Sequence, residues 1–149
     1  MMTLSENHLT QAAPIINEKL EPRSNSLPGT WYYSSNHILI NNERVKRGLQ
    51  PLTRRRDLDE MARTQSEAMA KAQQTFYESP DILRKDIQIS NRWLGENVAR
   101  GKSIRYVHEK LMDSIVDRAN FLDCRFNYLG IGSTRGNDGR LYICQLFLG

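Results

Sequence analysis

Two stretches of this sequence carry residue types that can do chemistry together. Gly95 precedes Glu96 and Asn97, and Asp117 and Arg118 occur further along the chain. Gly95 permits a sharp backbone turn just before the carboxylate and the amide. A helix between the two stretches would return Asp117 toward Glu96, so we expect both carboxylates to lie at one site. Two carboxylates in different environments can divide acid–base work between them, and their oxygens suit a hard cation.

Three amphipathic segments are expected to form the helices that position this site. Apolar residues recur at helical spacing in each, and short polar residues stand at the N-terminal ends. The predicted helices and caps are 36–47 with Ser34 or Ser35, 57–74 with Asp57, and 104–116 with Ser103. The side chains expected to face the core are Ile38, Val45 and Leu49; Leu58, Met61, Ala62, Met69 and Ala72; and Ile104, Val107, Leu111 and Ile115.

The C-terminal segment 141–148 indicates a strand that is covered on both faces. Leu141, Ile143 and Phe147 point to one face, and Tyr142, Cys144, Leu146 and Leu148 point to the other. Apolar side chains on both faces are typical of a strand that lies between two layers of the fold. Together with the predicted helices, this pattern favours an α/β fold in which a sheet lies between helical layers.

In this order, the segments resemble motifs of the CAP superfamily (cysteine-rich secretory proteins, antigen 5 and pathogenesis-related class 1 proteins; the SCP domain). The matching residues are Asn41-x-x-Arg44-x-x-x-Gly48-x-x-Pro51-Leu52, then Leu58, Ala62 and Met69, then Gly95-Glu96-Asn97, then Arg118-x-Asn120-x-Leu122, and finally Leu129-Gly-Ile-Gly132, Asp138-Gly139 and 142–147. The resemblance implies a short single-domain member, with a three-layer α-β-α sandwich and a mainly antiparallel central sheet. The CAP domain would span 35–149, after a flexible N-terminal tail over 1–34.

The resemblance also implies a central cleft, where many family members place two histidines and two acidic residues that can bind a divalent metal. Glu96 matches the acid of the family's Gly-Glu-Asn motif, and Asn97 lies beside it. Asp117 stands where the short relatives have a histidine, and Tyr77 or Glu78 stands where the other histidine is expected. Both cleft histidines are thus expected to be replaced.

This composition of the cleft disfavours zinc, which prefers imidazole and thiolate ligands. We therefore expect no resident cofactor, and Glu96 is interpreted as a hydrogen-bonded anchor of the fold. The alternative is a divalent cation such as calcium or magnesium, held by oxygens of Glu96, Asp117 and Glu78. The second acid of the family cleft would fall near Ser114, with Asp113 beside it.

The expected function is non-enzymatic binding, because no Ser-His-Asp, Cys-His or nucleotide-binding motif with supporting residues occurs in the sequence. Relatives of several lineages bind sterols, fatty acids or other lipids, or act extracellularly in defence and signalling. The segment 75–94 is expected to line such a ligand site or, equally, to complete the core. Its candidate residues are Phe76, Tyr77, Ile82, Leu83, Ile87 and Ile89. Two alternatives stay open: a metal-dependent hydrolase that uses Glu96 and Asp117, and a degenerate scaffold that binds only a protein partner.

Composition limits the partners and the compartment. With 21 basic and 17 acidic residues the net charge is +4. The densest basic run, 54–56, is followed at once by acidic residues and lacks interleaved aromatics, so no nucleic-acid partner is expected. No apolar run is long enough to span a membrane. Residues 1–35 lack the apolar stretch of a secretory signal, whereas the resemblance implies an extracellular protein, so the compartment and the oligomeric state stay open.

The two cysteines, Cys124 and Cys144, permit one disulfide. If residues 136–139 form a hairpin turn, Cys144 pairs with about residue 131, and Cys124 lies before the first strand of the hairpin. Two free thiols therefore agree with the sequence at least as well as a bond does.

Overall fold

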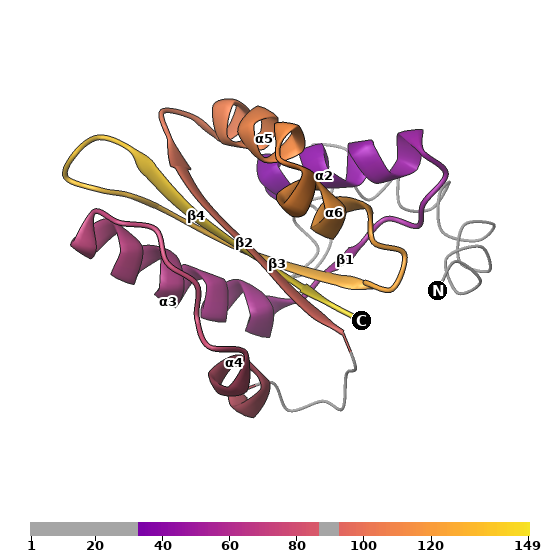
Figure 1. The fold of residues 1–149 in the computed structure, drawn as a ribbon, viewed down its shortest axis with the longest axis horizontal. Helices are drawn as coiled ribbons and strands as arrows, with labels where there is room; N and C mark the ends of the chain where they lie inside the picture. The colour runs from indigo at the N-terminus through magenta and orange to yellow at the C-terminus, as the bar shows by residue number, and fades with distance from the viewer. Residues whose placement is uncertain (1–32, 87–92) are drawn as a thin grey trace.

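The computed structural model describes residues 33–86 and 93–149 of the chain. Within these two ranges, one four-stranded sheet lies between helices (Figure 1). None of the helices there is long and apolar enough to cross a membrane. In chain order the elements are α2 (Ser35–Lys46), β1 (Thr53–Arg54), α3 (Arg56–Ala72), α4 (Pro80–Asp86), β2 (Leu94–Gly101), α5 (Ile104–Asp113), α6 (Ile115–Leu122), β3 (Tyr128–Arg135) and β4 (Leu141–Leu148).

The sheet has the strand order β1-β3-β4-β2. Strand β4 is antiparallel to both of its neighbours, β3 and β2, and the short β1 is parallel to β3. Helix α3 covers one face of the sheet, and α2, α5 and α6 cover the other (Figure 1). The predicted three-layer α-β-α sandwich with a mainly antiparallel sheet is therefore confirmed, and β1 makes the sheet mixed.

Strand β4 is the centre of the core because both of its faces are buried. Ile143 and Phe147 belong to the cluster that packs under α2, α5 and α6. Tyr142, Cys144 and Leu146 belong to the cluster under α3. The two-faced strand predicted from the sequence is confirmed, and its alternation decides which side chains reach each helical layer.

Helix α2 begins as predicted at a serine cap, since the Ser34 hydroxyl accepts a hydrogen bond from the His37 N–H. Its buried face differs from the expectation, because Ile38, Val45 and Leu49 are only half-buried. The buried residues of α2 are mainly polar: Asn36, His37, Ile40, Asn41 and Arg44. They are tolerated there because several bond to loop backbone; for example, the Asn41 side chain exchanges hydrogen bonds with Leu52 N–H and C=O.

The predicted tail lies almost wholly outside the described residues, which begin at Tyr33. Tyr33 itself is buried, and Ser34 supplies the cap of α2. These two residues therefore belong to the packed domain, and the prediction for residues 1–32 stays a prediction.

Helix α3 rests directly on β3. A Cβ atom on Gly132 would lie 2.2 Å from the carbonyl carbon of Ala62, so only glycine allows this approach. The predicted cap is wrong: Arg55 holds the N-cap position, and Asp57 lies in the first turn, where its charge suits the helix dipole. Leu58, Ala62 and Met69 are buried as predicted, but Ala72 is exposed because it lies in the last turn.

The single helix predicted over 104–116 is two helices. The chain leaves the helical conformation at Ser114, whose hydroxyl accepts a hydrogen bond from the Asp117 N–H and begins α6. Val107 and Leu111 are buried as expected, whereas Ile115 is 76% exposed. The break changes the direction of the chain, so Ile115 no longer continues the apolar stripe of α5.

The predicted turn at Gly95 is wrong, because Gly95 lies inside strand β2 and pairs with Phe147. Glycine is needed there for space: a Cβ atom would lie 2.8 Å from both Asn120 Oδ1 and Phe126 Cζ. The segment 75–94 also contains the short helix α4. The loop is therefore shorter than predicted, and Glu96 is held by a strand.

Both cysteines are buried, and no disulfide joins Cys124 to Cys144. Cys144 pairs with Gly132 in the β3–β4 hairpin, one residue from the predicted partner. Cys124 precedes β3, as predicted, and lies away from this pair.

Candidate functional site

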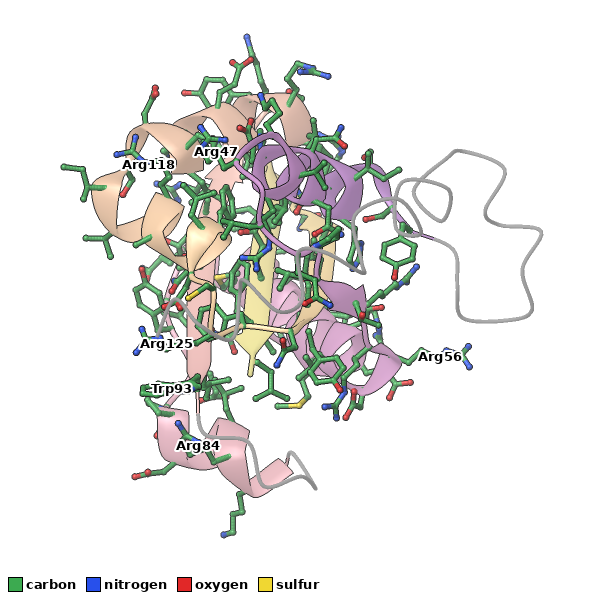
Figure 2. All side chains as sticks on the ribbon, turned by 90° about the vertical axis from the view of Figure 1, so that its right-hand side faces the viewer. Arg47, Arg56, Arg84, Trp93, Arg118 and Arg125 are labelled. Atoms are coloured by element: carbon green, nitrogen blue, oxygen red, sulfur yellow. The ribbon has the colours of Figure 1, made fainter. Side chains whose placement is uncertain are left out.

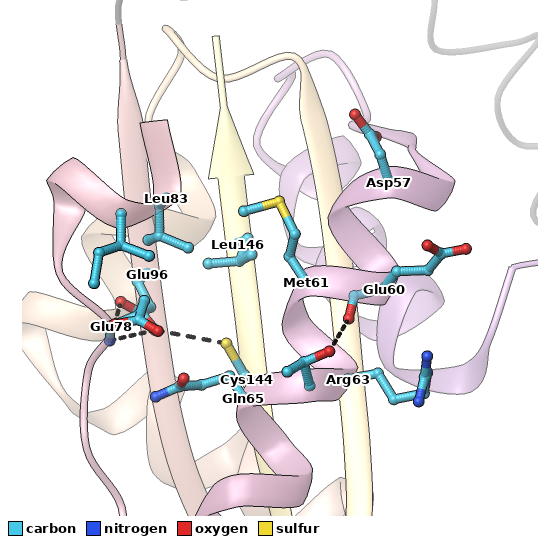
Figure 3. Close-up of a pocket in the computed structure, with 12 residues that line it drawn as sticks. Asp57, Glu60, Met61, Arg63, Gln65, Glu78, Leu83, Glu96, Cys144 and Leu146 are labelled. Atoms are coloured by element: carbon cyan, nitrogen blue, oxygen red, sulfur yellow. Dashed lines mark hydrogen bonds between the residues drawn. The ribbon is translucent and has the colours of Figure 1, made fainter. Parts of the chain in front are cut away.

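A cavity of about 470 Å³ opens between α3 and α4, above strands β2 and β4 (Figure 3). Its volume is in the range of small-molecule sites. Helix α3 contributes one wall, α4 and the segment before it contribute another, and the two strands form the floor. The lining residues are Asp57, Glu60, Met61, Arg63, Thr64, Gln65, Glu78, Ile82, Leu83, Glu96, Cys144 and Leu146.

Glu96 is the charged group on the floor of this cavity. Both of its carboxylate oxygens lie 3.2 Å from the Glu78 N–H, and Oε2 lies 3.6 Å from Cys144 Sγ (Figure 3). Burial raises the pKa of Glu96 above its usual value, and the hydrogen bonds from Glu78 and Cys144 oppose this shift only in part. Glu96 is thus hydrogen-bonded to the segment before α4 and also lines the cavity, and its role as an anchor of the fold stays a prediction.

Cys144 stands beside Glu96 on the floor. Burial, together with the negative charge of Glu96, raises the pKa of the Cys144 thiol well above its usual value. A thiol held in its protonated form is a weak nucleophile and a weak hydrogen-bond donor. The Glu96–Cys144 pair therefore offers a binding surface and lacks the thiolate that covalent catalysis needs.

A second hollow of about 280 Å³ lies on the other side of Glu96, against α4 and the start of β2. It shares Glu78, Leu83 and Glu96 with the larger cavity. Its other lining residues are Tyr77, Pro80, Arg84, Leu94 and Gly95. Glu96 therefore lies at the junction of two adjoining hollows.

The structure brings the two predicted carboxylates to the same region. Burial raises the pKa of Tyr77, and the negative charges of Asp117 and Glu96 raise it further, so both carboxylates act on the same phenol. Asp117 lies in the first turn of α6, and its backbone carbonyl accepts a hydrogen bond from Asn97 Nδ2. The side chain of Asn97 is fully buried and also bonds to Gln145. Asn97 is therefore structural and does not line the cavity.

Some of the predicted ligand-loop residues line the two hollows, and others do not. Ile82 is 48% exposed and lines the cavity together with the buried Leu83. Tyr77 is 60% exposed and lines the second hollow, and Phe76 is partly exposed beside it. Ile87 and Ile89 lie outside the described residues. The apolar part of the site thus comes from α4 and the strands as well as from the loop.

The possible divalent-cation site would lie among the acidic residues of the cavity region. Within 33–86 and 93–149, no three His, Cys, Asp or Glu side chains are arranged to hold a cation. Glu96, Glu78 and Asp117 lie in one region without forming such a group. The replacement of the family's two histidines and the absence of a resident cofactor stay predictions.

A row of Ser34, His37 and Asp59 lies away from the cavity. The Ser34 hydroxyl is 2.6 Å from His37 Nδ1, and His37 Nε2 is 3.3 Å from Asp59. Each member is engaged structurally: Ser34 caps α2, His37 is fully buried, and Asp59 also accepts the Ile131 N–H at 2.8 Å. With a buried histidine, this row is interpreted as a hydrogen-bonded anchor of α2.

Some basic side chains are dispersed over the molecule, but Arg100, Lys102, Lys110 and Arg140 line one hollow together. In Figure 2, Arg47 and Arg118 lie toward the same end of the molecule, Arg84 lies toward the opposite end, and Arg56 projects from one side. In the predicted basic run, Arg54 and Arg55 form ion pairs with Asp59 and Asp57. The expectation of no nucleic-acid partner stays a prediction.

The α3 wall and Cys144 were missed as site residues. The alternation of β4 placed Cys144 and Leu146 on one face, which is a usable signal. The polar residues of α3, including Gln65 and Glu60, carry no such signal because they look like an ordinary solvent-facing surface. Only the packing of α4 opposite α3 turns this surface into a cavity wall.

Comparisons with known proteins agree with the α-β-α fold described above. The model of the family described as "CAP: Cysteine-rich secretory protein family" matches residues 37–147. A protein of Bacillus subtilis, the uncharacterized protein YkwD, is 30% identical over 135 residues. That match includes 86% of this chain and 52% of YkwD, so the chain spans about half the length of this relative.

Several solved structures share the fold. An outer surface protein from Borrelia burgdorferi superimposes with a TM-score of 0.67 at 16% identity, over 75% of this chain and 87% of its own. An extracellular protein containing an SCP domain from Bacillus anthracis has a TM-score of 0.65 at 22% identity, over 76% of this chain and 38% of its own. A cysteine-rich secretory protein from Staphylococcus aureus has a TM-score of 0.64 at 21% identity, over 76% and 36%. At these identities the likeness concerns the fold alone.

Proposed function

The chain belongs to the CAP family of cysteine-rich secretory proteins, and from this premise we propose that it is a non-enzymatic binding module that holds a lipid or a sterol-like molecule between α3 and α4. An extracellular role in defence or signalling is part of the same proposal and is supported by the family alone. The proposal concerns the domain that matches, whatever further segments the relatives carry.

One observation supports this proposal more than any other: two adjoining hollows share an apolar wall at Leu83. Met61 and Leu146 extend the apolar surface on one side, and Leu94 and Tyr77 extend it on the other. Ile82 lies exposed at the rim of the larger hollow. Exposed apolar side chains around a cavity are typical of sites that bury an apolar ligand.

Binding rather than catalysis is favoured by the chemistry of the polar groups. The cavity offers one raised-pKa carboxyl, Glu96, and one protonated thiol, Cys144, as its floor groups. In the described part of the chain no histidine lines either hollow. The described lining holds no activated nucleophile, because the Cys144 thiol is held protonated, and this supports binding over hydrolysis.

A ligand panel tests the proposal. Purified protein is titrated calorimetrically with a sterol and with anionic, neutral and cationic alkyl compounds of one chain length. Saturable binding of at least one member is expected, and the Ile82→Asn variant should weaken it about tenfold by replacing apolar surface at the rim with a neutral polar group. Ile115→Asn, on the exposed surface of α6, is the matched control and should bind like the wild type. Failure of every member to bind, or equal binding by both variants, contradicts the proposal.

A further inference from the structure

We propose that the ligand of these hollows is a cationic amphiphile, a molecule with one ammonium group that pairs with Glu96 and an alkyl part that lies against Leu83. This inference rests on the proposed function and specifies the chemical class of its ligand. It follows from the charge around Glu96, from the contacts that Glu96 lacks, and from the place of Glu96 between two apolar surfaces.

The lining of the two hollows has the opposite sign from the protein as a whole. The chain has a net charge of +4. The two hollows together are lined by four carboxylates, those of Asp57, Glu60, Glu78 and Glu96, and by two guanidinium groups, those of Arg63 and Arg84. A cleft with a local surplus of negative charge attracts cations even in a basic protein.

Arg63, the basic residue that lines the larger cavity, does not pair with Glu96. Arg63 extends from α3 toward the rim opposite Glu96, and it pairs with Glu67 at 3.0 Å (Figure 3). No ion pair joins Glu96 to any lysine or arginine among the described residues. The charge of Glu78 also acts on Glu96 and raises its pKa further. Glu96 therefore has the negative charge of Glu78 beside it and no ion pair with a lysine or arginine among the described residues.

The hydrogen bonds of Glu96 leave room for such a partner. Its two oxygens share one donor, the Glu78 N–H, and the only other donor from the described part of the chain is the Cys144 thiol, which is weak. A carboxylate can accept about four hydrogen bonds. An ammonium group brings up to three donors and a positive charge, so it would satisfy Glu96 in a way that the protein does not.

Apolar surface continues from Glu96 in both directions. Leu83 is buried and lines both hollows, Leu94 lies at the start of β2, and Leu146 lies on the floor next to Cys144. An alkyl chain attached to the ammonium group would contact Leu83 from either hollow. A free inorganic cation would leave this surface unused, and the side chains described there do not form a metal site.

Fatty acids fit less well for a simple reason. A carboxylate ligand placed at the junction would lie next to Glu96 and Glu78, and one of the acids would have to take up a proton. A neutral alcohol would avoid the repulsion but would bring no charge to Glu96. The expected order of affinity is therefore amine, then alcohol, then acid.

Calorimetric titration with decylammonium, 1-decanol and decanoate tests this order at one chain length, near neutral pH and moderate salt. We expect decylammonium to bind at least about tenfold more tightly than decanoate, as a charge-assisted hydrogen bond predicts. The Glu96→Gln variant keeps the shape and an acceptor for the Glu78 N–H, and it should lose this preference. Glu109→Gln, an exposed site on α5, is the matched control and should retain it. Circular dichroism verifies that both variants are folded.

The outcomes separate the inference from the proposed function. Equal or tighter binding of decanoate or decanol overturns the inference and leaves the binding module in place. Tight binding of decylammonium that is unchanged in Glu96→Gln also overturns it, because the ammonium group then pairs elsewhere. If none of the three compounds nor the sterol binds, both the inference and the proposed function fail.

Discussion

The side-chain amide of Asn120 donates a hydrogen bond to Asn97 Oδ1 at 2.8 Å. Asn97 lies on β2 and Asn120 lies on α6, so this contact joins the two sequence motifs that first indicated a site. A second, longer bond from Asn120 Nδ2 reaches the Glu96 carbonyl at 3.4 Å. Asn120 thus holds the strand that carries Glu96 against α6.

Replacement of Asn120 by alanine should destabilise the fold. The buried Asn97 Oδ1 would lose its donor, and an unsatisfied buried acceptor costs about 1–3 kcal/mol. Urea denaturation followed by circular dichroism measures the change. Asn42→Ala, at an exposed position of α2, is the control and should alter stability by less than about 0.5 kcal/mol. A loss of the same size in both variants would show that the Asn120–Asn97 bond is not the cause.

The Glu96→Gln variant should be more stable than the wild type near neutral pH. The folded-state pKa of Glu96 lies above its ordinary value of 4.5, mainly because of burial. The folded protein therefore binds more protons than the unfolded chain above pH 4.5, and the contribution of Glu96 to stability falls as the pH rises through the raised pKa. Glutamine does not ionise. The Tm of the Glu96→Gln variant should therefore exceed that of the wild type most at about pH 7.5, and the difference should shrink as the pH falls toward 4.5.

Thermal melts of the wild type and the Glu96→Gln variant over this pH range measure the gain. A constant difference between the two proteins at every pH would mean that ionisation of Glu96 has no part in it. A stabilising substitution at Glu96 would agree with a residue kept for binding, since groups in binding sites are often unfavourable for stability.

Acidification should destabilise the protein through His37. Burial lowers the pKa of His37 below its ordinary value of 6.5, although Asp59 opposes this shift. The unfolded chain therefore takes up the proton first, and stability falls as the pH drops from 6.5 toward the folded-state pKa. His108 has a pKa lowered by burial in the same way. The free energy of unfolding should therefore depend less on pH, between about 7 and 5, in His37→Gln than in the wild type.

A His37→Gln, His108→Gln double variant should show the weakest dependence of the three proteins. Glu96 titrates identically in all of them, so its opposite contribution cancels in the comparison. An unchanged slope in the double variant would contradict the interpretation.

The break between α5 and α6 predicts different sensitivities for two neighbouring apolar residues. Leu111 is a buried residue of α5 in the hydrophobic core. Its replacement by alanine should lower the free energy of unfolding by about 2–5 kcal/mol. Ile115 is exposed after the break, so Ile115→Ala should change stability by less than about 0.5 kcal/mol. Chemical denaturation of both variants is the measurement. Comparable losses would indicate that the helix continues through Ser114, as its sequence pattern suggested.

The sequence predicted those parts of the fold whose signals are local. The two-sided apolar pattern of 141–148 predicted a covered central strand, and the serines before α2 and α5 predicted their N-terminal ends. It failed where packing overrides local preference. Gly95 looked like a turn residue because glycine favours turns, yet it lies in β2 to leave space for Asn120 and Phe126.

For the site, the sequence by itself determined which groups are present: the carboxylates of Glu96 and Asp117, the Asn97 amide and the apolar residues near Leu83. Only the tertiary structure decided which of them meet. Cys144 reaches Glu96 because β4 pairs with β2, and the polar face of α3 becomes a cavity wall because α4 lies across from it. A tight turn sets the register of β3 against β4, but the pairing of β2 with β4 and the packing of α4 opposite α3 join segments that no turn connects, so no local pattern encodes them.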